Sequence, residues 1–194
     1  RDAQESRGLG DVYKRQVGAA FLFAQTHHGS MKYAGPVRAQ LGVRSVFNIL
    51  GPLANPAMTN YIVLGVYEKE LVRPMADVMK NLGVKRALIV YGDDGLDEIS
   101  ISSTTSVCEI DGDEIKGYTI NPEELGLTLA KKEDIVGGTA DENAIITKDI
   151  LTGKEQGAKR DIVLLNAGAA LYTIGKAAVS YTHLRAHETP EHLV

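Results

Sequence analysis

The chain has 194 residues, of which 44% are hydrophobic and 24% are charged, and its formal net charge is −4. This balance suits a soluble globular domain with its own core and argues against a nucleic-acid or anionic-membrane partner. No apolar run is long enough to cross a bilayer, and the polar N-terminus does not resemble a signal peptide. The single cysteine, Cys108, excludes an internal disulfide, so a cytoplasmic setting is expected.

The two ends differ from the middle of the chain. Arg1–Gln16 contains DVYKRQ and Val179–Val194 contains SYTHLRAHETPEHLV, and neither segment has apolar periodicity. Both strings resemble translated sequencing-adapter text. His183 and His187 have the i, i+4 spacing of a metal pair, but the adapter interpretation is preferred. We therefore interpret residues 1–16 and 179–194 as non-native flanks and residues 17–178 as part of an α/β domain.

The front of this domain is expected to be helical. Gly18–Thr26 is an apolar, helix-like run, and Pro36–Leu41 and Ser45–Leu50 are typical of short helices. Gly51–Pro56, with the sequence GPLANP, is expected to be a loop because two prolines and a glycine interrupt regular hydrogen bonding.

A strand, a helix and a second strand follow. Asn60–Val66 and Arg86–Gly92 are typical of buried strands, and Glu68–Leu82 of an amphipathic helix that ends at Gly83. The apolar positions expected on the core face of the helix are Leu71, Met75, Val78 and Leu82. This order predicts a βαβ unit with parallel strands and a right-handed crossover.

The second half changes character. Ser106–Ile110 and Glu114–Ile120 flank Asp111-Gly112, which predicts an antiparallel hairpin. A capping box at Thr139–Glu142 predicts a helix through Leu151. Asp161–Thr173 is apolar on nearly all sides and is expected to be a core helix. The fold class is therefore α/β, with a mixed, largely parallel sheet flanked by helices.

Two clusters of residues could carry chemistry. Asp93–Glu98 holds four carboxylates just beyond a buried strand, which is the edge where open α/β sheets bind ligands. Asp97 and Glu98 offer hard oxygen ligands suited to Mg²⁺, although acidic turns are commonly only solvated. The second cluster spans His27 to Arg44, in which Arg38 could hold a carboxylate and His28 could donate a hydrogen bond.

Longer motifs identify a family. Phe21–Pro56, FLFAQTHHGSMKYAGPVRAQLGVRSVFNILGPLANP, resembles the signature of anthranilate phosphoribosyltransferases without a gap. DGLDEIS (Asp94–Ser100), GGTADENA (Gly137–Ala144) and RDIVLLNAGAALY (Arg160–Tyr172) follow in the family's order. The resemblance implies the class III phosphoribosyltransferase fold, a homodimer, and a place in tryptophan biosynthesis. The implied reaction joins anthranilate to phosphoribosyl pyrophosphate, giving N-(5-phosphoribosyl)anthranilate and pyrophosphate.

The resemblance also implies roles for single residues. Arg38 matches the arginine that holds the anthranilate carboxylate, and His28 matches a histidine of the anthranilate entry region. Asp97 and Glu98 match the acidic pair that binds Mg²⁺. The remaining implied residues are Ala24 and Gln25 on the anthranilate wall, where many relatives have proline in place of Gln25, and Lys32 near the site. No general acid or base is assigned, because the amine of anthranilate needs little deprotonation before attack.

Some family segments do not occur in the sequence. The glycine-rich GTGGD loop and the KHGN segment belong upstream of Val17, so we expect the fragment to be inactive alone. Three other interpretations stay open. The first is a pyrimidine nucleoside phosphorylase, but the HHGSMK…PVR stretch resembles the anthranilate enzymes more. The second is a non-catalytic nucleic-acid-binding relative, which should have a basic surface, whereas this chain is net acidic. The third is a non-functional assembly fragment.

Overall fold

The computed structural model describes residues 33, 35–37, 40, 42, 47–53, 55 and 58–176, and the chain divides into two units, Arg1–Met58 and Thr59–Val194. In the first unit, residues 35–37 are helical and α4 spans Phe47–Leu53. The loop predicted at Gly51–Pro56 is therefore wrong at its start, because α4 continues through Gly51 and Pro52. A proline removes one amide donor from a helix, and α4 ends one residue after it. The helix predicted at Gly18–Thr26 lies outside the described residues.

The second unit is built on a four-stranded sheet with the order β1-β2-β3-β4. Its strands are β1 (Tyr61–Gly65), β2 (Arg86–Gly92), β3 (Thr105–Asp111) and β4 (Glu114–Ile120). β1 and β2 are parallel, whereas β3 is antiparallel to both β2 and β4. The mixed sheet, the βαβ unit and the hairpin are thus confirmed. One of the three strand pairs in the described residues is parallel.

The helix between the parallel strands has a different buried face from the one predicted. A short 3-10 turn, Lys69–Leu71, precedes α5, which spans Val72–Asn81. The residues that α5 buries are Val72, Met75, Ala76 and Met79. Val78 and Leu82 are exposed, at 38% and 59%. The prediction was right for Met75 and wrong for Val78 and Leu82, because the sequence also supports an apolar stripe that starts at Val72, and packing against the sheet selected that one. Gly83 ends the helix as predicted, with φ +82°.

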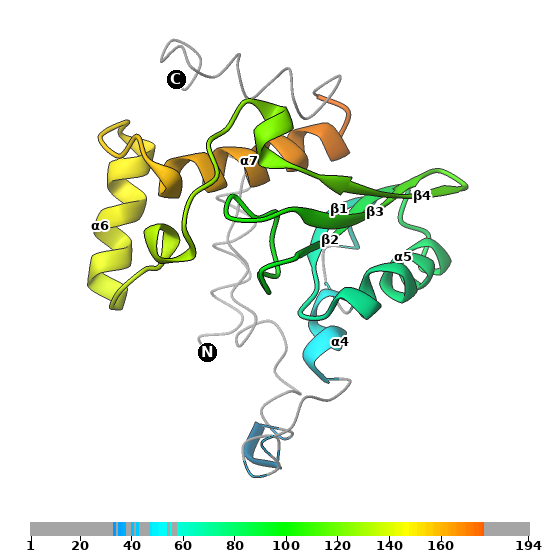
Figure 1. Ribbon diagram of the computed structural model, residues 1–194. Coiled ribbons are helices and arrows are strands. Elements are labelled where there is room, and N and C mark those ends of the chain that lie inside the picture. Colours follow the sequence, from blue (N-terminus) through cyan, green and yellow to red (C-terminus); the bar gives the residue numbers. More distant parts are fainter. Residues whose placement is uncertain are drawn as a thin grey trace, which may run out of the picture. The chain divides into compact units, whose positions relative to one another are not determined.

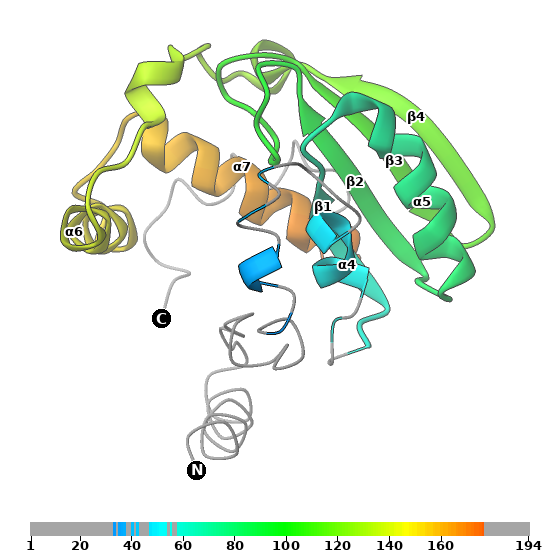
Figure 2. The same cartoon turned by 90° about the horizontal axis from the view of Figure 1, so that it is seen from below.

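Helices cover both faces of the sheet (Figures 1 and 2). Side chains alternate between the faces of a strand. On one face, Leu88 and Val90 of β2 and Val107 of β3 pack with Leu165 and Ala169 of α7 (Ala158–Thr173). On the other face lies α5, which contacts β2 and β3. The sheet therefore forms the middle of three layers.

The last third of the described chain extends beyond the sheet. After two 3-10 turns, Pro122–Leu125 and Lys132–Ile135, α6 spans Ala140–Leu151 and is drawn at one end of the unit in Figure 1. The predicted capping box is present, since the side chain of Thr139 accepts from the Glu142 amide and the Glu142 carboxylate accepts from the Thr139 amide. In α7, Leu165 is buried but Val163 is 44% exposed, so this predicted core helix buries one side only. Within the described residues, no helix is long and apolar enough to cross a membrane.

Candidate functional site

The acidic segment Asp93–Glu98 leaves the carboxyl end of β2, beside the end of the parallel strand β1. This is the edge at which α/β sheets bind ligands. The chain turns sharply here, because the Gly92 amide donates to the Leu96 carbonyl at 2.8 Å and the Gly95 amide donates to Gly92. Gly95 has φ +94°, a conformation that side chains other than glycine disfavour. The turn therefore fixes the start of the acidic segment.

The first two carboxylates of the segment are engaged within the protein. Asp93 accepts hydrogen bonds from Lys69 Nζ at 2.9 Å, Thr104 Oγ1 at 2.6 Å and Ser106 Oγ at 3.0 Å. Partial burial raises the pKa of Asp93, but these hydrogen bonds outweigh burial and leave its pKa below the usual value. Asp93 is thus held as a carboxylate by three hydrogen bonds, which occupy most of its about four acceptor positions.

Asp94 is engaged in the same way. It accepts from Ser100 Oγ at 2.8 Å and from the Ser102 hydroxyl, and more weakly from the Leu96 amide. Partial burial raises its pKa, but the hydrogen bonds from Ser102 and Ser100 lower it by more, so the net pKa is below the usual value. Asp94 therefore closes the loop onto the residues that lead into β3.

Asp97 and Glu98 differ from this inner pair. Both residues are exposed, but Asp93 is as well, so the difference lies in their contacts. Among the described residues, neither carboxylate has a hydrogen-bond or ion-pair partner, in contrast to Asp93 and Asp94. Of the four acidic residues that the sequence grouped together, two fold the loop and two are presented at its surface.

The backbone beneath Asp97 and Glu98 is held from three sides. A Cβ placed on Gly65, at the end of β1, would lie 1.5 Å from the Asp97 carbonyl oxygen, so the loop occupies the space of the missing side chain. Asn166 of α7 pairs with both backbone groups of Ile99, and the Ser100 amide donates to Thr105 Oγ1 at 2.9 Å. The backbone that carries the two exposed carboxylates is thus held in place by these contacts.

Exposed carboxylates suit hard divalent cations, of which Mg²⁺ is one. Mg²⁺ commonly binds through one or two carboxylates and completes its shell with water and phosphate oxygens. The described residues hold no group of three or more His, Cys, Asp or Glu side chains of the kind that encloses an ion. The adjacent carboxylates of Asp97 and Glu98 supply hard oxygen donors that could hold such an ion in an open site.

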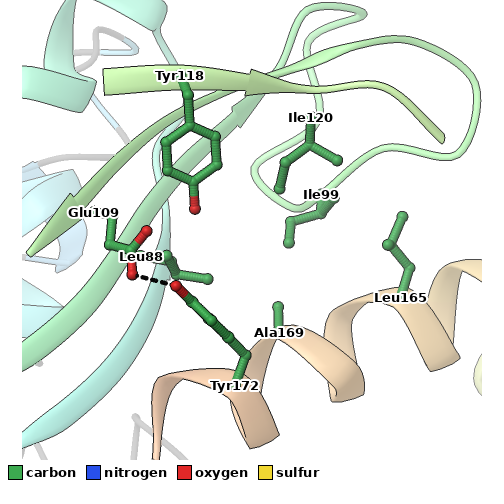
Figure 3. Close-up of a pocket in the computed structure, with 8 residues that line it drawn as sticks. All are labelled: Leu88, Ile99, Glu109, Tyr118, Ile120, Leu165, Ala169 and Tyr172. Carbon is green, nitrogen blue, oxygen red and sulfur yellow. Dashed lines mark hydrogen bonds between the residues drawn. The ribbon is translucent and has the colours of Figure 1, made fainter. Parts of the chain in front are cut away.

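A cavity of about 210 Å³ lies between the sheet and α7, and Ile99 is one of the residues that line it (Figure 3). Its wall is mainly apolar, but Glu109 of β3 accepts a hydrogen bond from the Tyr172 hydroxyl at 2.7 Å. The Arg86 guanidinium lies 5.2 Å from the centre of the Tyr172 ring. Burial, followed by the nearby Glu109, raises the pKa of Tyr118, whose hydroxyl points toward Glu109 in Figure 3. The cavity is therefore lined mainly by core residues, with polar groups at one end.

The predicted site residues fall into two groups. Asp97 and Glu98 lie together at the sheet edge, as placed by the end of β2. The predicted anthranilate residues Arg38, His28, Ala24 and Gln25, together with Lys32, lie outside the described residues.

The sequence interpretation did not identify Gly65 or Asn166. Asn166 left a visible signal, since it is a polar residue within the apolar stretch LLNAGAAL. Gly65 left none, because a glycine within a strand does not reveal which loop will approach it.

Comparisons with known proteins show the family to which the chain belongs. The glycosyl transferase family, a/b domain, matches residues 11–187. Among curated relatives, the anthranilate phosphoribosyltransferases of Lachnoclostridium phytofermentans and Lacticaseibacillus casei are each 55% identical over 159 and 171 residues, which is 82% and 88% of this chain. The chain spans about half the length of these relatives, 47% and 50%.

Solved structures show the same similarity. The anthranilate phosphoribosyltransferase of Thermus thermophilus superposes with a TM-score of 0.84 at 40% identity, over 91% of this chain and 52% of that one. The enzyme of Saccharomyces cerevisiae, solved in complex with PRPP and Mg, superposes with a TM-score of 0.70 at 29% identity, over 81% of this chain and 44% of that one. With its mixed sheet and matched residues, the chain belongs to the glycosyl transferase family, within its α/β domain.

Proposed function

We propose that the protein is an anthranilate phosphoribosyltransferase, which transfers phosphoribosyl from phosphoribosyl pyrophosphate to anthranilate and releases pyrophosphate. The single observation that carries the proposal is the pair of exposed carboxylates Asp97 and Glu98 at the carboxyl edge of the sheet, which have no hydrogen-bond or ion-pair partner within the described part of the chain. The names of the relatives support the reaction, and a yeast neighbour solved with PRPP and Mg supports the substrate class and the metal.

The proposed mechanism assigns separate tasks to the two clusters. Asp97 and Glu98 would hold Mg²⁺ beside the pyrophosphate group. When bound, Mg²⁺ supplies positive charge that offsets the negative charge developing on the leaving group. The acidic pair is exposed, which leaves room for phosphate oxygens and water around the ion.

The anthranilate side of the mechanism rests on Arg38, His28, Ala24 and Gln25. Arg38 would bind the anthranilate carboxylate with its planar guanidinium, which orients the amine toward C1 of the ribose. His28, Ala24 and Gln25 would line the wall of the same pocket, and Lys32 would add positive charge nearby. Holding the two reactants in this orientation supplies much of the rate enhancement, so no strong general base is required.

A chimera tests this proposal. Residues of this chain that match the Lachnoclostridium phytofermentans relative replace the corresponding half of that enzyme. We expect the chimera to consume anthranilate, measured as a loss of anthranilate fluorescence, only when phosphoribosyl pyrophosphate and Mg²⁺ are present. We also expect it to let a tryptophan auxotroph grow in medium without tryptophan. A stable chimera that is inactive with anthranilate, or that instead cleaves uridine with inorganic phosphate, would overturn the proposal.

Point variants of the chimera test the metal assignment. We predict that Asp97→Asn abolishes Mg²⁺-dependent turnover while the protein stays folded. Asp113→Asn is the matched control, because it makes the same change at an exposed aspartate in the β3–β4 turn. This turn lies at the other end of the strands from the acidic segment. Equal Mg²⁺ dependence in the two variants would refute the assignment of Asp97.

The resemblance further supports a cytoplasmic homodimer. Light scattering of the purified chimera tests the dimer, and a monomeric, fully active protein would contradict it.

A further inference from the structure

Asn166 contacts Ile99, the residue that follows the acidic segment Asp93–Glu98, through both polar atoms of its side-chain amide. Its Oδ1 accepts a hydrogen bond from the Ile99 amide, and its Nδ2 donates to the Ile99 carbonyl, both at 3.0 Å. The same Nδ2 also donates to the Ile162 carbonyl, one turn earlier in α7. One side chain therefore satisfies both backbone groups of Ile99 and fastens them to the helix.

The position of Ile99 explains why this contact is needed. Ile99 lies between the end of β2 at Gly92 and the start of β3 at Thr105, so no strand partner serves its backbone. Its residue exposure is only 1%. Buried backbone groups require partners, and Asn166 provides two of them at once.

The consequence reaches the neighbouring carboxylates. Ile99 follows Glu98 directly and is two residues from Asp97. Behind Asp97, the carbonyl rests on Gly65, where a Cβ would stand only 1.5 Å away. The peptide segment that carries both carboxylates is thus held by hydrogen bonds from Asn166 at Ile99 and packs closely on Gly65 at Asp97.

We propose that Asn166 is a positioning residue for the metal-binding pair Asp97 and Glu98, and this inference rests on the proposed assignment of Mg²⁺ to that pair. Mg²⁺ requires near-ideal octahedral geometry, so both carboxylates must keep a fixed separation and direction. Groups that orient metal ligands without touching the ion typically change metal affinity by about 10- to 100-fold when they are removed. Asn166 acts in this way through the Ile99 peptide.

If Asn166 had a purely structural role, its removal would leave the Mg²⁺ requirement unchanged. The chain offers a matched control, because Asn143 pairs in the same way with Gly138, accepting from its amide at 2.8 Å and donating to its carbonyl at 3.1 Å. Asn143 lies in α6, and Gly138 precedes that helix. Asn143→Ala therefore removes the same pair of bonds away from the acidic loop.

The experiment uses the chimera with Asn166→Ala, Asn166→Asp and Asn143→Ala. Hydrogen exchange is measured at the Ile99 amide, and the Mg²⁺ concentration for half-maximal turnover is measured together with KM for anthranilate. For Asn166→Ala we expect faster exchange at Ile99 and a half-maximal Mg²⁺ concentration raised about 10- to 100-fold, with KM for anthranilate changed much less. Asn143→Ala should leave both Ile99 exchange and the Mg²⁺ requirement unchanged.

Asn166→Asp keeps the inference testable if the alanine variant does not fold. The aspartate retains an acceptor for the Ile99 amide but replaces the donor with an oxygen that faces the Ile99 and Ile162 carbonyls, so a rise in the Mg²⁺ requirement is expected. Faster exchange at Ile99 with an unchanged Mg²⁺ requirement would overturn the positioning role while Asp97→Asn still abolishes Mg²⁺-dependent turnover. If Asp97→Asn also leaves the Mg²⁺ dependence unchanged, the metal assignment itself fails.

Discussion

Gly65 should be a site at which the smallest side chain is not tolerated. Gly65→Ala would place a methyl group 1.5 Å from the Asp97 carbonyl oxygen and 2.4 Å from its carbonyl carbon. Ordinary contact of a Cβ with such an atom begins at 3.4 Å, so the oxygen would have to move away by 1.9 Å (3.4 minus 1.5). The obstacle is backbone and not the flexible end of a side chain, so rotation of a side chain cannot relieve it.

The expected cost follows from this displacement. Inserting a methyl group into a packed position typically destabilises a protein by about 1–3 kcal/mol. Displacing a catalytic segment by about 1 Å can lower turnover about 100-fold. We therefore expect Gly65→Ala to lower the free energy of unfolding, or to move the Asp97 loop and lower turnover of the chimera, or both.

The assay has a matched control in the same sheet. Gly117 lies in β4, and a Cβ there would meet no atom closer than the Val107 carbonyl oxygen at 3.9 Å. Denaturant unfolding and Mg²⁺-dependent turnover are compared for Gly65→Ala and Gly117→Ala in the chimera. If Gly65→Ala proves as stable and as active as Gly117→Ala, the close approach of the Asp97 backbone does not exist as described, and the argument for a fixed acidic loop fails with it.

Three further predictions concern single side chains. Because the folded pKa of Asp94 lies below its usual value of 3.8, its carboxylate stabilises the fold above pH 3.8, and this contribution is lost as the pH falls through the folded pKa. The free energy of unfolding should therefore fall less steeply with decreasing pH in Asp94→Asn, and an identical pH dependence in the two proteins would contradict this. Thr139→Ala removes the capping box of α6 and should cost about 0.5–2 kcal/mol of stability, measured by denaturant unfolding; an unchanged midpoint would show that the cap carries no stability. Arg38→Ala in the chimera should mainly raise KM for anthranilate, whereas an effect confined to phosphoribosyl pyrophosphate would refute its assigned role.

The order of elements in the second unit followed from local sequence patterns. Continuous apolar runs predicted β1 and β2, the turn signal Asp111-Gly112 predicted the β3–β4 hairpin, and the box at Thr139–Glu142 predicted the start of α6. These signals are local, because a capping residue or a strand run acts on its immediate neighbours. The grouping of Asp97 and Glu98 beyond β2 was also predictable, since the strand that precedes them determines the edge at which they lie.

Long-range packing decided the rest. The apolar face of α5 had two possible registers, and contact with the sheet selected Val72, Met75, Ala76 and Met79 instead of the stripe that includes Val78 and Leu82. The four neighbouring carboxylates look alike in sequence, yet hydroxyls from residues 100 to 106 and the ammonium of Lys69 engage Asp93 and Asp94 only.

The support of the acidic loop is likewise a tertiary property. Gly65 lies 32 residues before Asp97, and Asn166 lies 67 residues after Ile99. A sequence pattern can place a carboxylate at the end of a strand, because strand and loop are adjacent in the chain. It cannot specify which distant glycine leaves room for the loop or which distant amide completes its hydrogen bonds, because those contacts exist only once the sheet and α7 have packed together.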